Sequence, residues 1–407
     1  MRRALPALSL LTMLASGCAS LPPAIGPTAV AGMPVPPSLE AEVEALARVE
    51  TYDDPLLNEY LAGIADRLAS EDEREAGVAP PAITVLRDPT IAAFTLPDGR
   101  VYLHTGLLSR VANEAQLAAV VAREITHLRR RAAATATSPS AITEAIAALA
   151  PSMIDASRPG VEAGQPLSPT AAVILGKGLT VAYAAALAGR GEVAEREADD
   201  GALERVVRAA YDPKEAPRVF ERLRRDARAG GPSERFFLTA EAGAKTRVER
   251  MTNLVASSYA VAAGLPDTVR DTAEFDAVLG PLVRENARLE LRAGRLRFAQ
   301  EQLDSALSAM PADPLAHLYT GDLHRVRGQR ARSVADRDEL ARAALASYER
   351  SEALDPGIAE VPRRIGLLYY QQGRYDLARG AFERYLAQNP TAPDAARVAE
   401  YVQILTR

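Results

Sequence analysis

Residues 122–128 read Ala-Arg-Glu-Ile-Thr-His-Leu and lie in a stretch, 114–131, whose apolar residues recur at helical spacing. A zinc peptidase places two histidines four residues apart on such a helix, and the glutamate after the first histidine is the general base. Glu124 and His127 occupy two of these places, but Arg123 stands where the first histidine belongs. Alone, this pattern occurs often by chance, and its ordinary interpretation is a solvated helix face with one buried histidine.

Further motifs flank this helix in a fixed order. The motifs are Ala-Phe-Thr-Leu-Pro-Asp-Gly at 93–99, Val-Tyr-Leu-His-Thr-Gly-Leu-Leu at 101–108, Asn-Glu-Ala-Gln-Leu-Ala at 113–118, Glu-Arg-Glu-Ala-Asp at 195–199 and Ala-Tyr-Asp-Pro at 210–213. Together they resemble metallopeptidase family forty-eight, the gluzincin group that includes HtpX-like and BepA-like proteins, over about residues 40–265. The resemblance implies an α+β zincin-like peptidase domain, which we place at 38–265.

The resemblance assigns a role to each matching residue. It implies that Glu124 is the general base, that His127 is the second zinc ligand and that Glu195 is the third. Asp199 would be the partner that supports Glu195. If the site is active, it would therefore hold zinc.

Two positions depart from the family's pattern. Arg123 replaces the first histidine, and Thr239-Ala240 stands where the family usually reads Thr-His-Pro. A guanidinium has no lone pair to offer a metal and stays protonated, and two ligands fall short of the three that a catalytic zinc needs. We expect Arg123 to fill the volume of the metal and to pair with Glu195 or Glu124 through charge-assisted hydrogen bonds.

Two short β-compatible runs precede the helix. They lie at 83–86 and 101–103, on either side of the turn residues 97–99. The resemblance implies that Gly99–Leu103 is an edge strand that holds an extended substrate by main-chain pairing. His104 follows this run and is an alternative metal ligand, although its ordinary interpretation is a packed or surface histidine.

The N-terminus has the pattern of an exported lipoprotein. After a charged head, the apolar run 4–14 is too short to span a bilayer, and residues 14–18 resemble the lipobox in which Cys18 becomes acylated. We expect a lipoprotein signal peptide at 1–17 and a Pro-rich tether at 18–37; the alternative is a plain signal peptide that leaves a free thiol. No aspartate follows the cysteine, which resembles the outer-membrane sorting signal of a Gram-negative bacterium, so we expect a periplasmic, lipid-anchored protein.

The C-terminal third contains a repeat with an interval of 34 residues. Its features resemble the tetratricopeptide repeat: small residues where two helices cross, an aromatic residue on the second helix and a proline at its end. Three units fit, with an insertion near 329–340, so we expect an α-helical repeat solenoid at 281–407. The recurring residues are Ala344, Tyr348 and Pro356, followed by Ala378, Phe382 and Pro390.

Length and composition bound the remaining choices. A chain of 407 residues holds two or three cores, and 48% apolar with 25% charged residues is typical of a globular protein. The absence of tryptophan and an aromatic content of 5% favour close-packed helices over β-sandwiches. Together with the two β-compatible runs, this predicts a mostly α fold with a small β-sheet. A formal charge of −5 makes nucleic acid an unlikely partner class.

Three functions compete at this stage. The first is a pseudopeptidase that keeps the peptidase fold, is anchored to the membrane and presents a repeat groove to envelope proteins. The second is an active zinc metalloendopeptidase with an atypical ligand set. The third is an adaptor in which only the repeats act.

Overall fold

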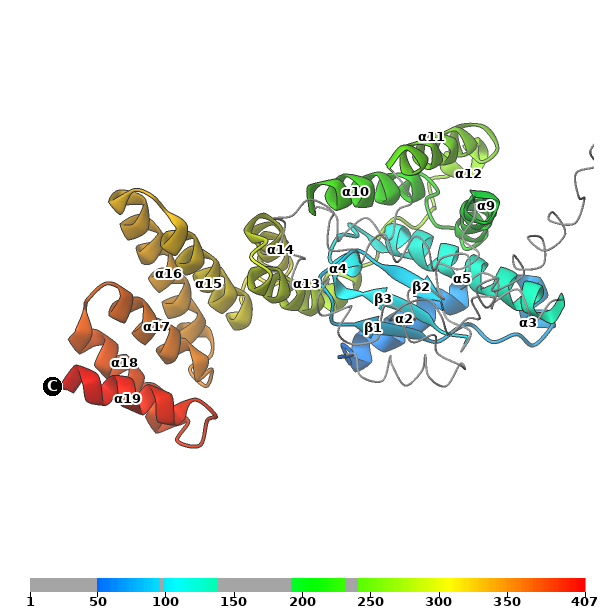
Figure 1. Ribbon diagram of the computed structural model, residues 1–407. Coiled ribbons are helices and arrows are strands. Elements are labelled where there is room, and N and C mark those ends of the chain that lie inside the picture. Colours follow the sequence, from blue (N-terminus) through cyan, green and yellow to red (C-terminus); the bar gives the residue numbers. More distant parts are fainter. Residues whose placement is uncertain (1–49, 96–98, 138–191, 231–240, 407) are drawn as a thin grey trace, which may run out of the picture.

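The computed structural model describes residues 50–95, 99–137, 192–230 and 241–406. It is mostly helical, with one small sheet in the N-terminal part and a row of helix pairs in the C-terminal part (Figure 1), as the sequence predicts. The N-terminal part contains α2 (Pro55–Arg67), α3 (Glu71–Glu75), β1 (Ile83–Leu86), β2 (Ala93–Thr95), β3 (Val101–His104), α4 (Thr105–Leu108), α5 (Glu114–Thr137), α9 (Glu192–Arg208), α10 (Glu215–Gly230), α11 (Glu241–Ser257) and α12 (Ala260–Ala263). The C-terminal part contains α13 (Phe275–Arg292), α14 (Leu296–Ala309), α15 (Pro314–Arg330), α16 (Val334–Leu354), α17 (Glu360–Gln371), α18 (Tyr375–Gln388) and α19 (Ala395–Thr406).

The sheet has the strand order β1-β3-β2. β3 is parallel to β1, where Leu103 lies opposite Val85, and antiparallel to β2, where Tyr102 lies opposite Phe94. The expectation that Gly99–Leu103 forms an edge strand is therefore wrong, because β3 is hydrogen-bonded on both sides. The two predicted strands are confirmed, and β2 was missed because three buried residues are too short a run to show alternation.

The motif helix α5 is buried on all sides over its first turns. Ala115 and every residue from Leu117 to Ala122 have no exposed surface, which is the pattern of a helix inside a core. α9 packs against it, and Gly201 marks the crossing, since a Cβ there would lie 2.6 Å from Thr126 Cγ2. This close approach brings the first turns of α9 beside the centre of α5.

The helix α13 belongs to two packing units. Phe275, Leu279 and Leu282 lie in the large buried cluster of the N-terminal part, whereas Ala287 lies in the cluster of the repeats. Pro281, where the repeat region was expected to begin, lies inside this helix. A chain cut at residue 281 would therefore divide an element that both parts use.

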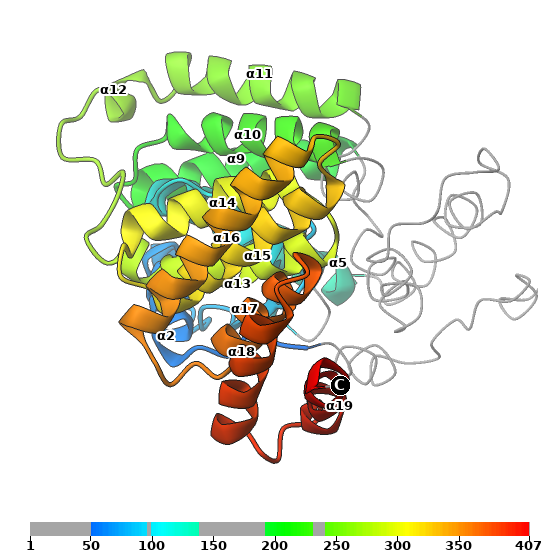
Figure 2. The ribbon, with the colours of Figure 1, turned by 90° about the vertical axis from the view of Figure 1, so that its left-hand side faces the viewer.

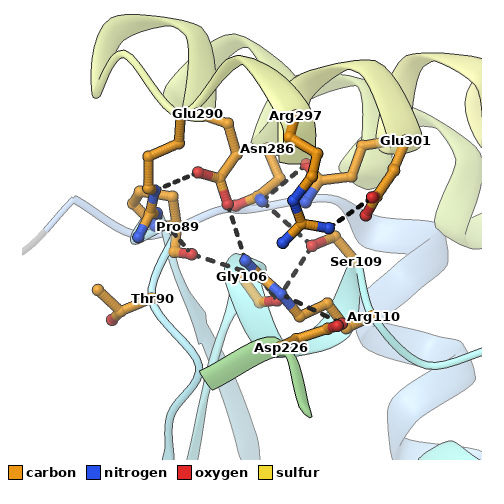
Figure 3. A network of polar contacts seen from close by, with 12 residues as sticks. Pro89, Thr90, Gly106, Ser109, Arg110, Asp226, Asn286, Glu290, Arg297 and Glu301 are labelled. Atoms are coloured by element: carbon orange, nitrogen blue, oxygen red, sulfur yellow. Dashed lines mark hydrogen bonds and ion pairs between the residues drawn. The ribbon is translucent and has the colours of Figure 1, made fainter. Parts of the chain in front are cut away.

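A buried polar network also joins the two parts (Figure 3). Arg110, which follows α4, donates to Glu290 of α13 over 3.0 Å, and both side chains are nearly or fully buried. Asn286 donates to Ser109 over 3.1 Å and to Gln302 of α14 over 3.0 Å. Because these partners satisfy buried polar groups, the first helix pair is fixed to the N-terminal part by more than apolar packing.

The repeats form helical hairpins stacked one after another (Figure 2). Gly321 and Gly366 sit where the helices of a pair cross, because a Cβ would lie 2.4 Å from the Tyr348 ring and 2.6 Å from the Phe382 ring. The middle pair is long, with 17 residues in α15 and 21 in α16 against 12 in α17 and 14 in α18. The extra residues expected near 329–340 therefore extend these helices and their connection.

Several expectations lie outside the described residues: the signal peptide at 1–17, Cys18, the tether at 18–37 and Thr239-Ala240. Within the described part of the chain, none of the helices combines the length and the apolar character that a membrane crossing requires.

Candidate functional site

The Arg123 guanidinium lies among three carboxylates. Its Nη1 donates to Glu124 over 2.8 Å, its Nη2 donates to Glu195, and its Nε is 3.4 Å from Asp199 Oδ1. Arg123 is 1% exposed, and Glu124 and Asp199 have no exposed surface. α5 and α9 are thus joined by one buried cation at the level of the motif.

Arg247 of α11 is a second cation in this cluster, and the sequence analysis did not identify it. It donates to both oxygens of Asp199, at 2.9 and 2.7 Å, and its Nη1 is 3.1 Å from Glu195. The ring of Phe220, on α10, lies 5.9 Å from the Arg123 guanidinium carbon and 5.8 Å from that of Arg247. No motif spacing marks Arg247, because it comes from a helix distant in sequence.

His127 lies one turn beyond Arg123 on the same face of α5. Its Nε2 is 3.4 Å from Glu195 Oε1, and the residue is 5% exposed. The structure therefore brings five predicted site residues together in one place: Arg123, Glu124, His127, Glu195 and Asp199.

The electrostatics of the cluster favour the charged form of Arg123. Burial opposes the charge, but Glu195, Glu124 and Asp199 outweigh it and raise the pKa of the guanidinium above its ordinary value. The two arginines bring two positive charges to three carboxylates, and Arg247 contacts the two carboxylates that come from α9. A buried anionic cluster without these cations would carry a large desolvation cost.

These residues do not fit a catalytic zinc ion. Zinc needs three protein ligands with free lone pairs, yet Glu195 Oε2 already faces both Arg123 and Arg247. The guanidinium supplies a cation where the carboxylates converge and supplies no ligand atom. Across the residues that the structure describes, no group of three or more His, Cys, Asp or Glu side chains is arranged to hold a metal ion.

His104 takes part in a different buried cluster. Its Nδ1 is 2.9 Å from Thr90 Oγ1 and 3.6 Å from Asp88 Oδ1, and the residue is 1% exposed. Burial raises the pKa of Asp88, but the charge and hydrogen bond of His104 and the hydrogen bonds from Thr90 outweigh this and lower it to about 2. The structure thus places His104 at the end of β3, where it packs with Thr90, Asp88 and the edge of the Phe94 ring.

Comparison with known families follows the two parts of the fold. Residues 55–255 match the model of Peptidase family M48, and residues 331–403 match a tetratricopeptide repeat model. The chain carries an M48 peptidase domain followed by tetratricopeptide repeats. The M48 domain contains the whole Arg123 cluster, so Arg123 occupies a motif position inside a recognised peptidase domain.

Curated relatives match about half of the chain or less. The beta-barrel assembly-enhancing protease of Escherichia coli K12 is 27% identical over 215 residues, which are 51% of this chain and 42% of that protein. A Vibrio cholerae protein provisionally given the same name is 32% identical over 181 residues, 42% of this chain and 34% of that protein. The mitochondrial metalloendopeptidase OMA1 of Schizosaccharomyces pombe is 30% identical over 168 residues, 41% of this chain and 44% of that protein. The chain therefore spans less than half the length of each of these relatives.

Proposed function

We propose that this chain is a pseudopeptidase: an M48 domain that has given up zinc-dependent hydrolysis and acts, with its repeats, as a protein-binding adaptor in envelope protein quality control. The observation that carries the proposal is the contact of Arg123 with Glu124 and Glu195. The general base of an M48 peptidase must activate a metal-bound water, whereas here its carboxylate accepts a hydrogen bond from a buried guanidinium.

The partner class follows from the repeats and from the relatives. Stacked helical hairpins create extended concave surfaces that bind protein segments. Two relatives are named for the assembly of beta-barrel proteins, and the third is a mitochondrial metalloendopeptidase. Envelope proteins that contact the repeat groove are therefore the proposed partners, and proteolysis is not part of the proposed activity.

The proposed location is the periplasm of a Gram-negative bacterium, with the chain anchored to the outer membrane through acylated Cys18. The support is the lipobox-like sequence at 14–18. Two or more acyl chains give stable anchoring without a membrane-spanning helix. Expression with a labelled fatty acid tests this step: label should enter the chain, and Cys18→Ala should abolish it.

Metal content and hydrolysis test the central claim. The purified chain is analysed for zinc by mass spectrometry and incubated with casein, with Glu124→Gln as the matched variant. We expect far less than stoichiometric zinc and the same absence of cleavage in both proteins. Stoichiometric zinc, together with cleavage that Glu124→Gln abolishes, would overturn the proposal.

A further inference from the structure

The helix α10 has two faces of opposite character. Its buried face packs on the M48 core and includes Phe220, the residue beneath both arginines of the site. Its outer side carries basic residues at positions that fall on one face of the helix, which we call the α10 basic face. This face consists of Lys214, just before the helix, and Arg218, Arg222, Arg225 and Arg228, of which all but the half-buried Arg222 are exposed.

The acidic partners of this face lie mostly beneath it. Arg218 pairs with Glu215 over 2.5 Å, and Arg222 and Arg225 lie 4.0 and 3.8 Å from Asp226. Glu215 is 1% exposed and Asp226 is 8% exposed, whereas the side chains of Arg218 and Arg225 are 57% and 70% exposed. Glu221 is the half-exposed acidic residue on this side, and Arg224 pairs with it over 2.7 Å. The charge presented to solvent by α10 is therefore positive, although the chain as a whole carries −5.

The basic face is suited to a flat anionic surface rather than to a peptide. A protein interface gains most of its affinity from apolar anchors that fill pockets. None of the large exposed apolar side chains of the described residues lies on α10, and of the five basic residues only Arg222 lines the cavity of about 190 Å³ between α10 and the first helix pair. The face runs for about 21 Å along a helix, and anionic headgroups attract basic residues at such a surface without pockets.

We propose that the α10 basic face docks on the anionic phospholipid headgroups of a membrane. The proposed anchor at Cys18 would keep the chain near such a surface, and in this respect the inference rests on the proposed function. Docking would place the membrane on the outer side of the helix whose inner side covers the Arg123 cluster. It would also orient the repeats, because the first pair is fixed to the M48 core through Arg110 and Glu290.

Vesicle binding tests the proposal without the anchor. The chain from residue 18 onward carries Cys18→Ser, so that neither the signal segment nor an acyl group contributes. Binding is measured by sedimentation with phosphatidylcholine vesicles and with vesicles of equal parts phosphatidylcholine and phosphatidylglycerol. We expect binding to the anionic vesicles only, and its loss when salt is raised.

Matched variants identify the surface. Arg218→Gln, Arg222→Gln and Arg225→Gln together should weaken binding at least about tenfold, since each cation near an anionic surface contributes independently. The control removes the same charge from exposed positions of α16 with Arg337→Gln, Arg342→Gln and Arg350→Gln, and should bind as the parent does. Thermal melting checks that both variants remain folded.

Two results would overturn the inference: no binding to anionic vesicles, or equal losses in the two variants. If vesicle binding is absent, binding to polyglutamate is measured, and a positive result there would assign the face to an acidic protein instead. None of these measurements depends on acylation or on hydrolysis. The docking surface can therefore fail while the pseudopeptidase stands, and the reverse also holds.

Discussion

Arg247 and Asp199 form a bidentate ion pair, in which the guanidinium donates to both carboxylate oxygens, at 2.9 and 2.7 Å. The same carboxylate is 3.4 Å from Arg123 Nε, so one residue of α9 connects α5 with α11. In an M48 peptidase a metal ion would supply the positive charge at this point. Here two arginines place positive charge at this point, and their contacts with Glu195 and Asp199 join α5 and α11 to α9.

Removal of one of these cations should therefore lower the free energy of unfolding. Arg123→Met keeps much of the side-chain volume but leaves Glu124, Glu195 and Asp199 with one cation fewer. Removing one partner of a buried ion pair typically lowers the free energy of unfolding by about 3–5 kcal/mol. Urea unfolding measures the change. Arg130→Met is the control on the same helix, because the Arg130 side chain is 37% exposed in its pair with Glu197. This substitution should lower the free energy of unfolding by about 1 kcal/mol or less. Equal stability of the two variants would contradict the structural role of Arg123.

The missing ligand can also be restored. Arg123→His would place two histidines four residues apart on α5, with Glu195 opposite them, which is the ligand set of a catalytic zinc site. We expect this variant to copurify with about one zinc per chain and its melting temperature to fall when a chelator is added. Arg123→Gln removes the same charge without adding a strong ligand and should bind no zinc. A zinc content as low in the histidine variant as in this control would show that more than one residue blocks the metal.

The residues of the site could be predicted from the sequence, but the complete set of contacts could not. Arg123, Glu124 and His127 lie close together on one helix, and Glu195 and Asp199 lie on a second. The local pattern alone did not link the two helices; the resemblance of the ordered motifs to the family did. Arg247 was missed because its role depends on how α11 packs, which no local spacing encodes. The central position of β3 was missed for a related reason: strand order depends on pairing partners, and β2 is too short to give a periodic signal.

The close crossing of the two helices in a tetratricopeptide repeat predicts which glycines cannot be replaced by a larger residue without a loss of stability. Gly366→Ala would place a Cβ 2.6 Å from the Phe382 ring and should destabilise the chain by about 1–3 kcal/mol through overpacking. Gly380, on the partner helix of the same pair, has nothing within 4 Å of the same position. Gly380→Ala should therefore be neutral or stabilise by up to about 1 kcal/mol through helix propensity. Thermal melting of the two variants distinguishes these outcomes, and a destabilised Gly380→Ala would argue against crossing geometry as the cause.

Truncations should reveal how the two parts depend on each other. Removal of 281–407 cuts α13 and takes away the buried residues Leu282, Val283 and Glu290, the last of which pairs with Arg110. We expect this product to be insoluble or unfolded. Removal of 311–407 keeps α13 and α14 and should leave a folded M48 part with a cooperative melt. Circular dichroism compares the two products, and a stable fold after the first cut would show that the shared helix is dispensable.

Acid should weaken the contact between α3 and the core at one carboxylate. Glu73 accepts two hydrogen bonds from Arg205, at 2.8 and 2.7 Å, and one from Arg129 at 2.9 Å, and it also caps the amide of Ser70. The hydrogen bonds from Arg205 lower the pKa of Glu73 well below its ordinary value; burial opposes the shift, and the amide of Ser70 and the charge of Arg205 support it.

A carboxyl whose pKa is depressed by folding contributes its full stability above the unfolded pKa, about 4.3 for Glu, and loses it as pH falls toward the folded pKa. Glu73→Gln should therefore lower the free energy of unfolding by about 1–3 kcal/mol at neutral pH, since bonds to a charged group are lost. The difference between parent and variant should stay constant above about pH 5 and shrink below about pH 4. Urea unfolding at a series of pH values measures it. A difference that is independent of pH down to the acid transition would mean that the charge of Glu73 does not contribute to stability. The stabilisation would then come from the geometry of its hydrogen bonds alone.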